Sequence, residues 1–461
     1  MEAKLYGQNK GGTSINGIIK DYYAYAGENI SAGDLVEYVN GIAGKTEGTS
    51  VDTVINTADK FTGYRISAVA LDNNRVFVAH SYGSDYHLYG VVLNINGATI
   101  SAGTDVALNT VLYSGYAIDT LLLPDGRVFI AHSYNGNYSP YATVVSIDGT
   151  TIAIDISQEL DGTDRGGYVL SAELLPNGNV FIAHSRGTDL DLYAMVVSIN
   201  GNTLTVGSDT SLNGTNKTGY AISTCLLPNG NVFVAHCYGS SYTLYGIVCT
   251  ISGTTISKGT DTSLVNSQYA GSEISAISLD NGKVFIAHCY GSNHYLYGIV
   301  CSVSGTTITA GTDTKLTSAA ADGNKLATLL LSNGDVFLAH SGGESNYYSY
   351  VAIVGVSGTT ITVHTDTKIN SLTKTGYTVS PCFLTNDIIF MAHCYGSDYH
   401  LYAQIWGIDD NKIPTNHIIA PYYETQVRKV TTGLFDGVAK TSGLGGDGTA
   451  HNEIVSIWTK E

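Results

Sequence analysis

The chain alternates short runs of apolar and β-branched residues with turns rich in glycine, asparagine and aspartate. One representative unit begins with the run 220–227 and continues, after a Pro-Asn-Gly turn, with the run 231–236. A third run, 243–251, and a short fourth run, 254–257, follow after further polar residues. Runs of this length separated by Asn-Gly turns are typical of β-hairpins. Each unit therefore predicts four antiparallel strands, which we term A to D.

The phrase Phe-x-Ala-His recurs seven times along the chain. Its histidines are His80, His132, His184, His236, His288, His340 and His393. They are spaced 52 residues apart five times and then 53 residues apart. A regular period of this size is typical of stacked equivalent units. Seven copies of a four-stranded unit predict an all-β fold, a seven-bladed β-propeller of four-stranded blades, with an open β-solenoid as the competing architecture.

The seventh copy departs from the others at its outer strand. The motif Gly-Thr-Asp-Thr, or a variant, ends the outer strand of the earlier copies, with the aspartates Asp105, Asp209, Asp261, Asp313 and Asp366. After Trp406, however, the chain runs to residues 411–415 without this motif, whereas Val51-Asp52-Thr53 precedes the first full copy. We expect residues 49–55 to form the outer strand of the last blade, because this closes the ring and covers open sheet edges.

Two flanks, 1–47 and 416–461, lie outside the repeat. Each contains short apolar runs with glycine turns, for example at 30–43 and at 453–458. Closure of the ring brings the flanks together in space. We therefore predict one small discontinuous β module, built from 1–47 with 416–461, into which the propeller, 48–415, is inserted.

Ala32-Gly-Asp-Leu-Val36 near the start and Gly437-Val-Ala-Lys-Thr-Ser-Gly443 near the end resemble segments of small β modules in virion structural proteins of tailed phages of Gram-positive hosts. Such modules occur on tail fibres and on head-surface or decoration proteins. The resemblance covers about 90 residues and transfers no functional residues. It implies a particle-attached protein that docks to other virion proteins through its terminal module and displays its propeller.

The composition excludes several classes of partner. The formal net charge is −17 and only 13% of residues are charged, so no basic stripe is available for nucleic acid or for an anionic membrane surface. No apolar run is long enough to span a bilayer, and the first residues lack the apolar core of a secretory signal. We expect a virion protein made in the host cytoplasm, with no membrane partner.

The repeated histidines suggest a scaffold rather than a metal or catalytic centre. Seven equivalent positions around a ring cannot converge within the coordination distance of one metal ion. We expect these histidines to hydrogen-bond between strands, with the motif aspartates as partners, and we expect no metal and no cofactor. The seven cysteines form no Cys-x-x-Cys pair and replace small residues of other copies, so we interpret them as core residues.

Tyrosines form a second repeated series. The loops between strands B and C carry Tyr82, Tyr86, Tyr134, Tyr238, Tyr242, Tyr290, Tyr395 and Tyr399. The loops between strand D and the next strand A carry Tyr64, Tyr116, Tyr168, Tyr220 and Tyr377. Both kinds of loop share one face of a propeller, so this face is expected to present tyrosines to a ligand or to pack them between blades. A further set is interpreted as core: Tyr89, Tyr141, Tyr193, Tyr245, Tyr297 and Tyr402.

Departures from the repeat are further candidates for binding a ligand. Blade three has Arg186 where other copies have tyrosine. Blades one and seven share one phrase, which gives Asp85 with His87 and Asp398 with His400. Ring closure makes these blades neighbours, so the doubled pair is a candidate site for a metal or a sugar, although we favour duplication of the repeat as its explanation.

The sequence contains no P-loop, no dinucleotide fingerprint and no Gly-x-Ser-x-Gly elbow, and its loops hold few carboxylates. We therefore expect no enzyme, and no catalytic residues, but a phage structural protein whose propeller face binds a host surface glycan or protein. A capsid decoration protein with a structural role and a carbohydrate-active enzyme are the alternatives. The oligomeric state is left open, since no heptad pattern is present.

Overall fold

The computed structural model describes the propeller region almost throughout and the chain ends at individual strands. The described residues are 20–26, 35–39, 53–56, 61–96, 99–162, 166–214, 218–279, 282–317, 325–342, 346–369, 375–385, 388–397, 399–407, 426–429, 437–438 and 454–459. Several residues of the sequence motifs lie outside them: Val51, Asp52, Asp398 and 411–415.

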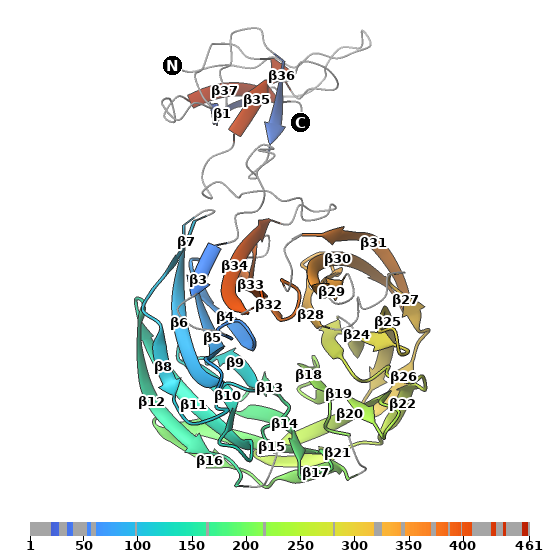
Figure 1. The fold of residues 1–461 in the computed structure, drawn as a ribbon. Coiled ribbons are helices and arrows are strands. Elements are labelled where there is room, and N and C mark those ends of the chain that lie inside the picture. Colours follow the sequence, from blue (N-terminus) through green and yellow to red (C-terminus); the bar gives the residue numbers. More distant parts are fainter. Residues whose placement is uncertain are drawn as a thin grey trace.

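The first four blades follow one another along the chain as antiparallel sheets (Figure 1). Blade 1 consists of β4 (Ile66–Asp72), β5 (Arg75–Tyr82), β6 (His87–Asn96), β7 (Thr99–Ala102) and β8 (Val106–Asn109). Blade 2 consists of β9 (Ile118–Leu122), β10 (Val128–Tyr134), β11 (Ser139–Asp148) and β12 (Thr151–Glu159). Blade 3 consists of β13 (Leu170–Leu174), β14 (Val180–Arg186), β15 (Asp191–Asn200), β16 (Thr203–Val206) and β17 (Thr210–Asn213). Blade 4 consists of β18 (Ile222–Leu226), β19 (Val232–Tyr238), β20 (Thr243–Ser252), β21 (Thr255–Lys258) and β22 (Thr262–Val265).

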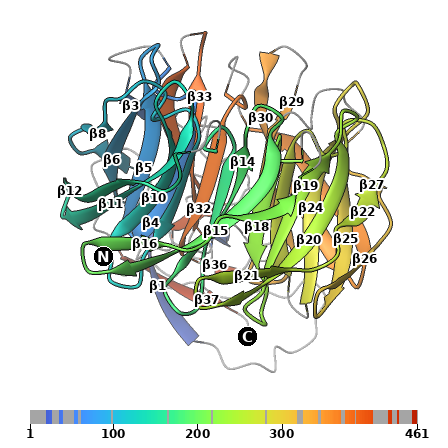
Figure 2. The same cartoon turned by 90° about the horizontal axis from the view of Figure 1, so that it is seen from below.

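The remaining three blades complete the ring. Blade 5 consists of β23 (Ile274–Leu279), β24 (Lys283–Tyr290), β25 (Tyr295–Ser304), β26 (Thr307–Ala310) and β27 (Thr314–Lys315). Blade 6 consists of β28 (Leu326–Leu330), β29 (Val336–Gly342), β30 (Tyr348–Ser357) and β31 (Thr360–Lys368). Blade 7 consists of β32 (Val379–Thr385), β33 (Ile388–Tyr395), β34 (His400–Gly407) and β3 (Thr53–Asn56). Figure 1 shows the sheets around a common centre and Figure 2 shows the same ring from its side, and the seven sheets confirm the predicted seven-bladed propeller.

The ring closes as the sequence predicts. β3 pairs antiparallel with β34, with Thr53 opposite Ala403 and Val54 opposite Tyr402 (Figure 1). The strand that precedes the first blade therefore completes the last one. This arrangement covers the outer edge of β34, which an open array of sheets would leave unpaired.

The hydrophobic core lies between neighbouring blades. One cluster joins Phe77 of blade 1 to Val128 and Ile130 of blade 2, and equivalent clusters recur around the ring. The phenylalanine of every Phe-x-Ala-His phrase is fully buried. Because strand side chains alternate between the two faces of a sheet, each blade packs against both of its neighbours. All seven cysteines are free thiols, and Cys382 is the one that is only partly buried.

The innermost strands are joined from blade to blade by side chains. Ser67, Ser171, Ser223 and Ser380 each accept, through Oγ, the backbone N–H of a residue on the inner strand of the next blade, at 2.9–3.1 Å. Asp119 does the same with a carboxylate oxygen, 2.8 Å from the Ala172 nitrogen. An inner strand is a sheet edge whose N–H groups need partners, and these side chains provide them.

The two chain ends form one further sheet, as predicted. Its strand order is β36 (Gly437–Val438), β2 (Leu35–Val39), β35 (Gln426–Lys429), β1 (Lys20–Ala26) and β37 (Ile454–Thr459). β1 and β2 come from the first 39 residues, whereas β35, β36 and β37 come from residues 426–459. β1 pairs antiparallel with β37. The domain boundaries at 47/48 and 415/416 fall outside the described residues and remain a prediction.

Candidate functional site

The seven repeated histidines lie in the interior of the blades. Each is fully buried, and its Nδ1 lies 2.6–2.9 Å from the carbonyl oxygen of the following residue. In five blades Nε2 lies 2.9–3.0 Å from the aspartate of the outer-strand motif: Asp105, Asp209, Asp261, Asp313 or Asp366. In these five blades both ring nitrogens are used within the blade, which ties the outer strand to strand B and keeps the histidine from a ligand.

Blade 2 replaces the aspartate by a hydroxyl. His132 Nε2 lies 2.9 Å from Thr143 Oγ1, which in turn contacts Ser157 at 3.3 Å. Burial lowers the pKa of His132 to about 4, opposed in part by the carbonyls of Ser133 and Ser114. This histidine is therefore neutral at physiological pH and has a structural hydrogen-bonding role.

Five tyrosines of the B–C loops form stacked or tilted pairs with strand C, which we call the rim pairs. They are Tyr82/Tyr89, Tyr134/Tyr141, Tyr238/Tyr245, Tyr290/Tyr297 and Tyr395/Tyr402, with ring centroids 4.0–4.8 Å apart. The interpretation of the strand C tyrosines as core is wrong, because all of them are half-buried. Strand C pairs with strand B on one side and with the short outer strands on the other, as β6 does with β5 and with β7 and β8.

Arg186 takes the place of the loop tyrosine in blade 3. Its guanidinium carbon lies 4.6 Å from the centroid of the Tyr193 ring, and Nη1 lies 2.9 Å from Asp209 Oδ2. The cation over the ring replaces the stacked tyrosine of the other rim pairs. Because Asp209 neutralises it, Arg186 is committed to the blade.

The doubled Asp/His pair is not assembled into a site by the described residues. Asp85 is exposed in the B–C loop, and His87 is half-buried at the start of β6; Asp398 lies outside the described residues. His400 is half-buried, and its Nδ1 has no hydrogen-bond partner among the residues that the structure describes. Within the described ranges no group of three or more His, Cys, Asp or Glu side chains is placed to hold a metal ion.

A continuous band of aromatic rings lies on the face formed by the B–C and D–A loops, and we call it the aromatic crescent. It comprises Tyr347, Tyr377, Tyr399, Phe61, Tyr64, Tyr86, Tyr113, Tyr116, Tyr138 and Tyr168. Successive ring centroids are 4.8–6.1 Å apart, so the rings touch one another from blade 6 through blades 7, 1 and 2 to blade 3. Phenol oxygens meet at 3.3 Å in two places, Tyr377 with Tyr64 and Tyr116 with Tyr168.

The backbone of the crescent is unusual. The last residue of each B–C loop has φ between 48° and 55°, and these residues are Tyr86, Tyr138, Leu190, Tyr242, His294, Tyr347 and Tyr399. This region favours glycine and asparagine and costs a bulky residue about 1–2 kcal/mol. Six of the seven blades nevertheless place an aromatic ring there. Retention of rings at a costly backbone position points to a role of the side chains beyond folding.

Hydrogen bonds between blades hold this conformation. The carbonyl of the loop residue accepts the N–H of the glycine that precedes strand A in the next blade, for example Tyr86 from Gly115 and Tyr399 from Gly63, at 2.5–2.6 Å. A Cβ at Gly63 would lie 2.6 Å from the His400 carbonyl oxygen, so no larger residue fits. The rings are therefore fixed to the scaffold, which lowers the entropy lost when a ligand binds.

The crescent is interrupted in blade 3 and gives way to a polar sector in blades 5 and 6. Leu190 replaces the aromatic ring, and a shorter arc of Tyr220, Tyr242, Tyr269 and His294 follows. Beyond it, Glu273 and Lys325 form an ion pair of 2.7 Å. The face therefore has a long aromatic side and a short side where the charges neutralise each other.

Partial burial raises the pKa of several phenol groups in the crescent. Burial raises the pKa of Tyr86, Tyr377 and Tyr399, and it raises that of Tyr116 to about 12 with a further contribution from the Tyr168 hydroxyl. These phenols stay protonated at physiological pH. They offer O–H donors beside apolar ring faces.

Some tyrosines that the repeat pattern predicts for the ligand site lie apart from one another in the structure. Tyr86 and Tyr399 lie in the crescent and Tyr242 in the shorter arc, whereas Tyr82, Tyr134, Tyr238, Tyr290 and Tyr395 belong to the rim pairs. The repeat pattern did not indicate Phe61, Tyr113, Tyr138 and Tyr347 as site residues. The available signal was position: Phe61 and Tyr113 each stand three residues before a D–A loop tyrosine.

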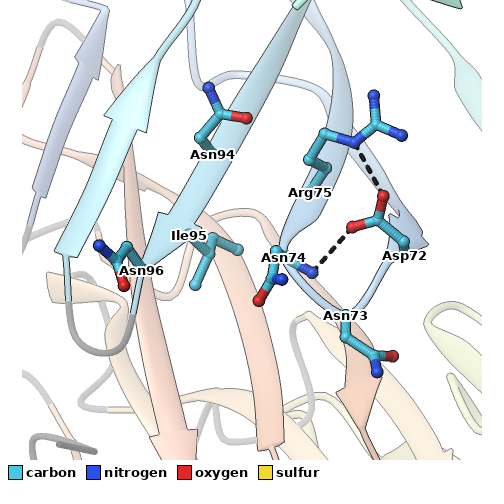
Figure 3. Close-up of a pocket in the computed structure, with 7 residues that line it drawn as sticks. All are labelled: Asp72, Asn73, Asn74, Arg75, Asn94, Ile95 and Asn96. Carbon is cyan, nitrogen blue, oxygen red and sulfur yellow. Dashed lines mark hydrogen bonds and ion pairs between the residues drawn. The ribbon is translucent and has the colours of Figure 1, made fainter. Parts of the chain in front are cut away.

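The opposite face carries a shallow polar groove at the turns of blade 1 (Figure 3). It is lined by Asp72, Asn73, Asn74, Arg75, Asn94, Ile95 and Asn96. Arg75 pairs with Asp72 at 2.8 Å and donates to the Gly149 carbonyl of the next blade. Asp72 and Arg75 are thus paired with each other, and the groove has no aromatic ring among the residues that line it.

Comparison with known proteins places the chain by its fold. No protein-family model matches it, and no curated protein matches it. A solved protein from Lactobacillus plantarum superposes with a TM-score of 0.51 at 14% identity, covering 77% of this chain and 99% of the other. A protein of unknown function from Dyadobacter fermentans gives 0.49 at 14% identity, covering 80% and 100%. A six-bladed fungal lectin from Aleuria aurantia gives 0.43 at 14% identity, covering 68% and 99%.

At such low identity the likeness to the Lactobacillus plantarum protein concerns the fold alone. The seven sheets of its own ring define the chain as a β-propeller protein. Among the described residues, no helix is long and apolar enough to cross a membrane.

Proposed function

We propose that this chain is a non-enzymatic virion surface protein of a tailed phage, whose aromatic crescent binds a glycan or a protein of the host surface. The crescent is the observation that supports binding: ten rings that touch one another, several at a costly positive φ, on one face of the propeller. Half-buried phenols combine a rigid apolar face with an O–H group. This combination suits the C–H faces and hydroxyls of sugars, so a glycan is the preferred ligand.

The terminal sheet supports the proposed attachment. It unites strands from both chain ends, so one module holds the propeller at two points. In this proposal it docks to other virion proteins, in keeping with the resemblance of the flanks to phage modules. Antibodies against the propeller should label intact particles produced from the genome that encodes the chain. Particles that lack the protein would refute the virion assignment.

Binding is tested with the full chain on an array of bacterial surface glycans. The wild type should bind, and Tyr116→Ala in the crescent should weaken binding at least about tenfold, since an interface aromatic often contributes about 2 kcal/mol or more. The matched control is Tyr290→Ala in a rim pair, which should bind like the wild type. If both variants bind equally, the crescent is not the site. If no glycan and no host-cell protein binds, a structural decoration role replaces the proposal.

A carbohydrate-active enzyme is a second candidate, favoured by one observation. Glu173 and Asp119 lie on inner strands of neighbouring blades, and burial raises their pKa to about 8 and about 6, respectively. A carboxylic acid that stays protonated at neutral pH resembles a general acid. Against an enzymatic role, Asp119 accepts N–H groups of Ala172 and Thr120 and thereby joins two blades.

Turnover decides between the candidates. Host wall polysaccharide is incubated with the wild type and with Glu173→Gln, and released reducing ends are measured. The binding proposal expects no release from either protein. Release that Glu173→Gln abolishes would replace it by the enzymatic one.

A further inference from the structure

Arg65 is a positively charged side chain within the aromatic crescent. Its guanidinium carbon lies 4.8 Å from the Tyr64 ring centroid and 5.3 Å from that of Tyr116. Its Nε donates a hydrogen bond of 2.9 Å to the Tyr116 carbonyl oxygen. Burial raises the pKa of Tyr86 and Tyr377, and the positive charge of Arg65 opposes part of that rise. Arg65 therefore interacts electrostatically with both of these tyrosines. The guanidinium is therefore fixed in the middle of the crescent.

The hydrogen bond between blades does not require an arginine. The equivalent residue in blade 7, Thr378, makes the same kind of bond through Oγ1, 2.8 Å from the Tyr64 carbonyl oxygen. A short neutral side chain thus suffices to join neighbouring blades at this position. The bond between blades therefore requires neither the positive charge of Arg65 nor its terminal N–H groups.

No carboxylate of the described residues neutralises Arg65. Two other cations near this face are paired: Lys325 with Glu273 at 2.7 Å and Arg186 with Asp209 at 2.9 Å. In a chain with a net charge of −17, an uncompensated guanidinium in an aromatic setting stands out. Aromatic faces around an arginine orient its planar group, and that planar group presents paired donors suited to an oxyanion.

We propose that Arg65 receives an oxyanion, a carboxylate or a phosphate, carried by a saccharide that lies on the aromatic crescent. This inference rests on the proposed glycan-binding function and specifies its ligand class. The crescent supplies the surface on which the sugar rings pack, and Arg65 selects chains that bear a negative charge. Charge-assisted hydrogen bonds from a partly desolvated guanidinium are stronger than those between neutral groups.

The test compares charged polymers with a neutral counterpart. The probes are polygalacturonate, its fully methyl-esterified form and poly(glycerol phosphate) bearing glucose, each titrated against the full chain. Arg65→Thr is the decisive variant, because Thr378 shows that threonine preserves the bond between blades. Tyr116→Ala serves as the variant that removes a ring. Thermal melting of each protein checks that the propeller is intact.

We expect Arg65→Thr to weaken binding of at least one charged polymer about tenfold and to leave weak binding of the methyl ester unchanged, while Tyr116→Ala weakens both. Which charged polymer binds distinguishes carboxylate from phosphate. If Tyr116→Ala loses binding but Arg65→Thr does not, the oxyanion inference is wrong and glycan binding stands. If polymers bind equally to the wild type and to both variants, or bind to none of them, the proposed function fails together with the inference.

Discussion

The Ser380 hydroxyl accepts a hydrogen bond of 2.9 Å from the N–H of Ala68, across 312 residues of sequence. This bond joins the inner strands of blades 7 and 1, which are the last and the first of the ring. The same kind of bond recurs between other neighbouring blades. One step of the ring differs in sequence: Ala327 stands at the acceptor position, and Pro381, at the donor position of the next blade, has no N–H. Acceptor and donor are thus absent together.

This pattern predicts different results for two serine/alanine exchanges. Ser380→Ala removes the acceptor and leaves the Ala68 N–H without its partner, so it should lower the free energy of unfolding by about 1–2 kcal/mol. Ala327→Ser adds a hydroxyl where Pro381 offers no N–H, so it should give no stabilisation. Chemical denaturation of both variants checks this. Equal effects of the two exchanges would show that these bonds do not stabilise the ring.

Two glycines differ in how they tolerate an added methyl group. A Cβ at Gly63 meets backbone atoms of Tyr399 and His400 at 2.6–2.9 Å, across the closure between blades 7 and 1. At Gly246 the nearest atom is the edge of the Phe233 ring at 2.7 Å, and equivalent blades carry alanine, as at Ala142. Gly63→Ala should therefore cost about 1–3 kcal/mol of stability or more, and Gly246→Ala clearly less, as measured by chemical denaturation. A larger loss for Gly246→Ala would argue against the tight closure.

Glu173 should make stability depend on pH. Burial raises its pKa to about 8 in the folded chain, whereas an unfolded glutamate has a pKa near about 4.3. Between these values the folded state holds a proton that the unfolded state has released, so stability falls as pH rises through this window. The slope cannot exceed about 1.4 kcal/mol per pH unit, because the folded and unfolded states differ by at most one proton at this group.

Glu173→Gln cannot ionise and should lose this dependence. Its stability relative to the wild type should increase from about pH 5 to about pH 8, measured by denaturant titration at several pH values. A constant difference across that range would mean that the Glu173 carboxyl is ionised in the folded chain.

Removing the Tyr86 ring from the crescent should change the stability of the chain little and its saccharide binding strongly. Tyr86→Gly relieves a φ of 51° that costs about 1 kcal/mol, and this gain offsets part of the stabilisation that the Tyr86 ring provides by packing on Phe61, Tyr64 and Tyr113. We expect the free energy of unfolding to change by less than about 2 kcal/mol while binding of the saccharide falls at least about tenfold. Tyr86→Phe, which keeps the ring, should bind within a few-fold of the wild type. A glycine variant that binds normally would show that Tyr86 is structural.

The fold could be predicted from the sequence because the repeat has a regular period. Seven copies of Phe-x-Ala-His indicated the blade number, and the displaced motif at 51–53 indicated the closing strand. The candidate binding site was harder to predict from the sequence. Tyr82 and Tyr86 stand four residues apart in one loop, yet one stacks on strand C and the other enters the crescent. That division depends on the positive φ of Tyr86, which a repeat pattern does not reveal.

Arg65 is a second site residue that the repeat pattern does not reveal. Its repeat position holds alanine, valine, glutamate, lysine or threonine in other blades, so no pattern marks it. Its candidate role emerges only from packing between blades: ring closure brings Tyr377 beside Tyr64, and the start of blade 2 brings Tyr116 beside Arg65. Residues whose meaning depends on packing between blades are the ones that sequence reasoning misses here.

Glycan binding by the aromatic crescent is tested most directly by a crystal structure of the chain with a saccharide that it binds. We predict a sugar ring packed on Tyr64, Tyr86 or Tyr116, with a charged substituent at Arg65. A saccharide seated on the rim pairs, or in the polar groove at Asp72 on the opposite face, would contradict this proposal.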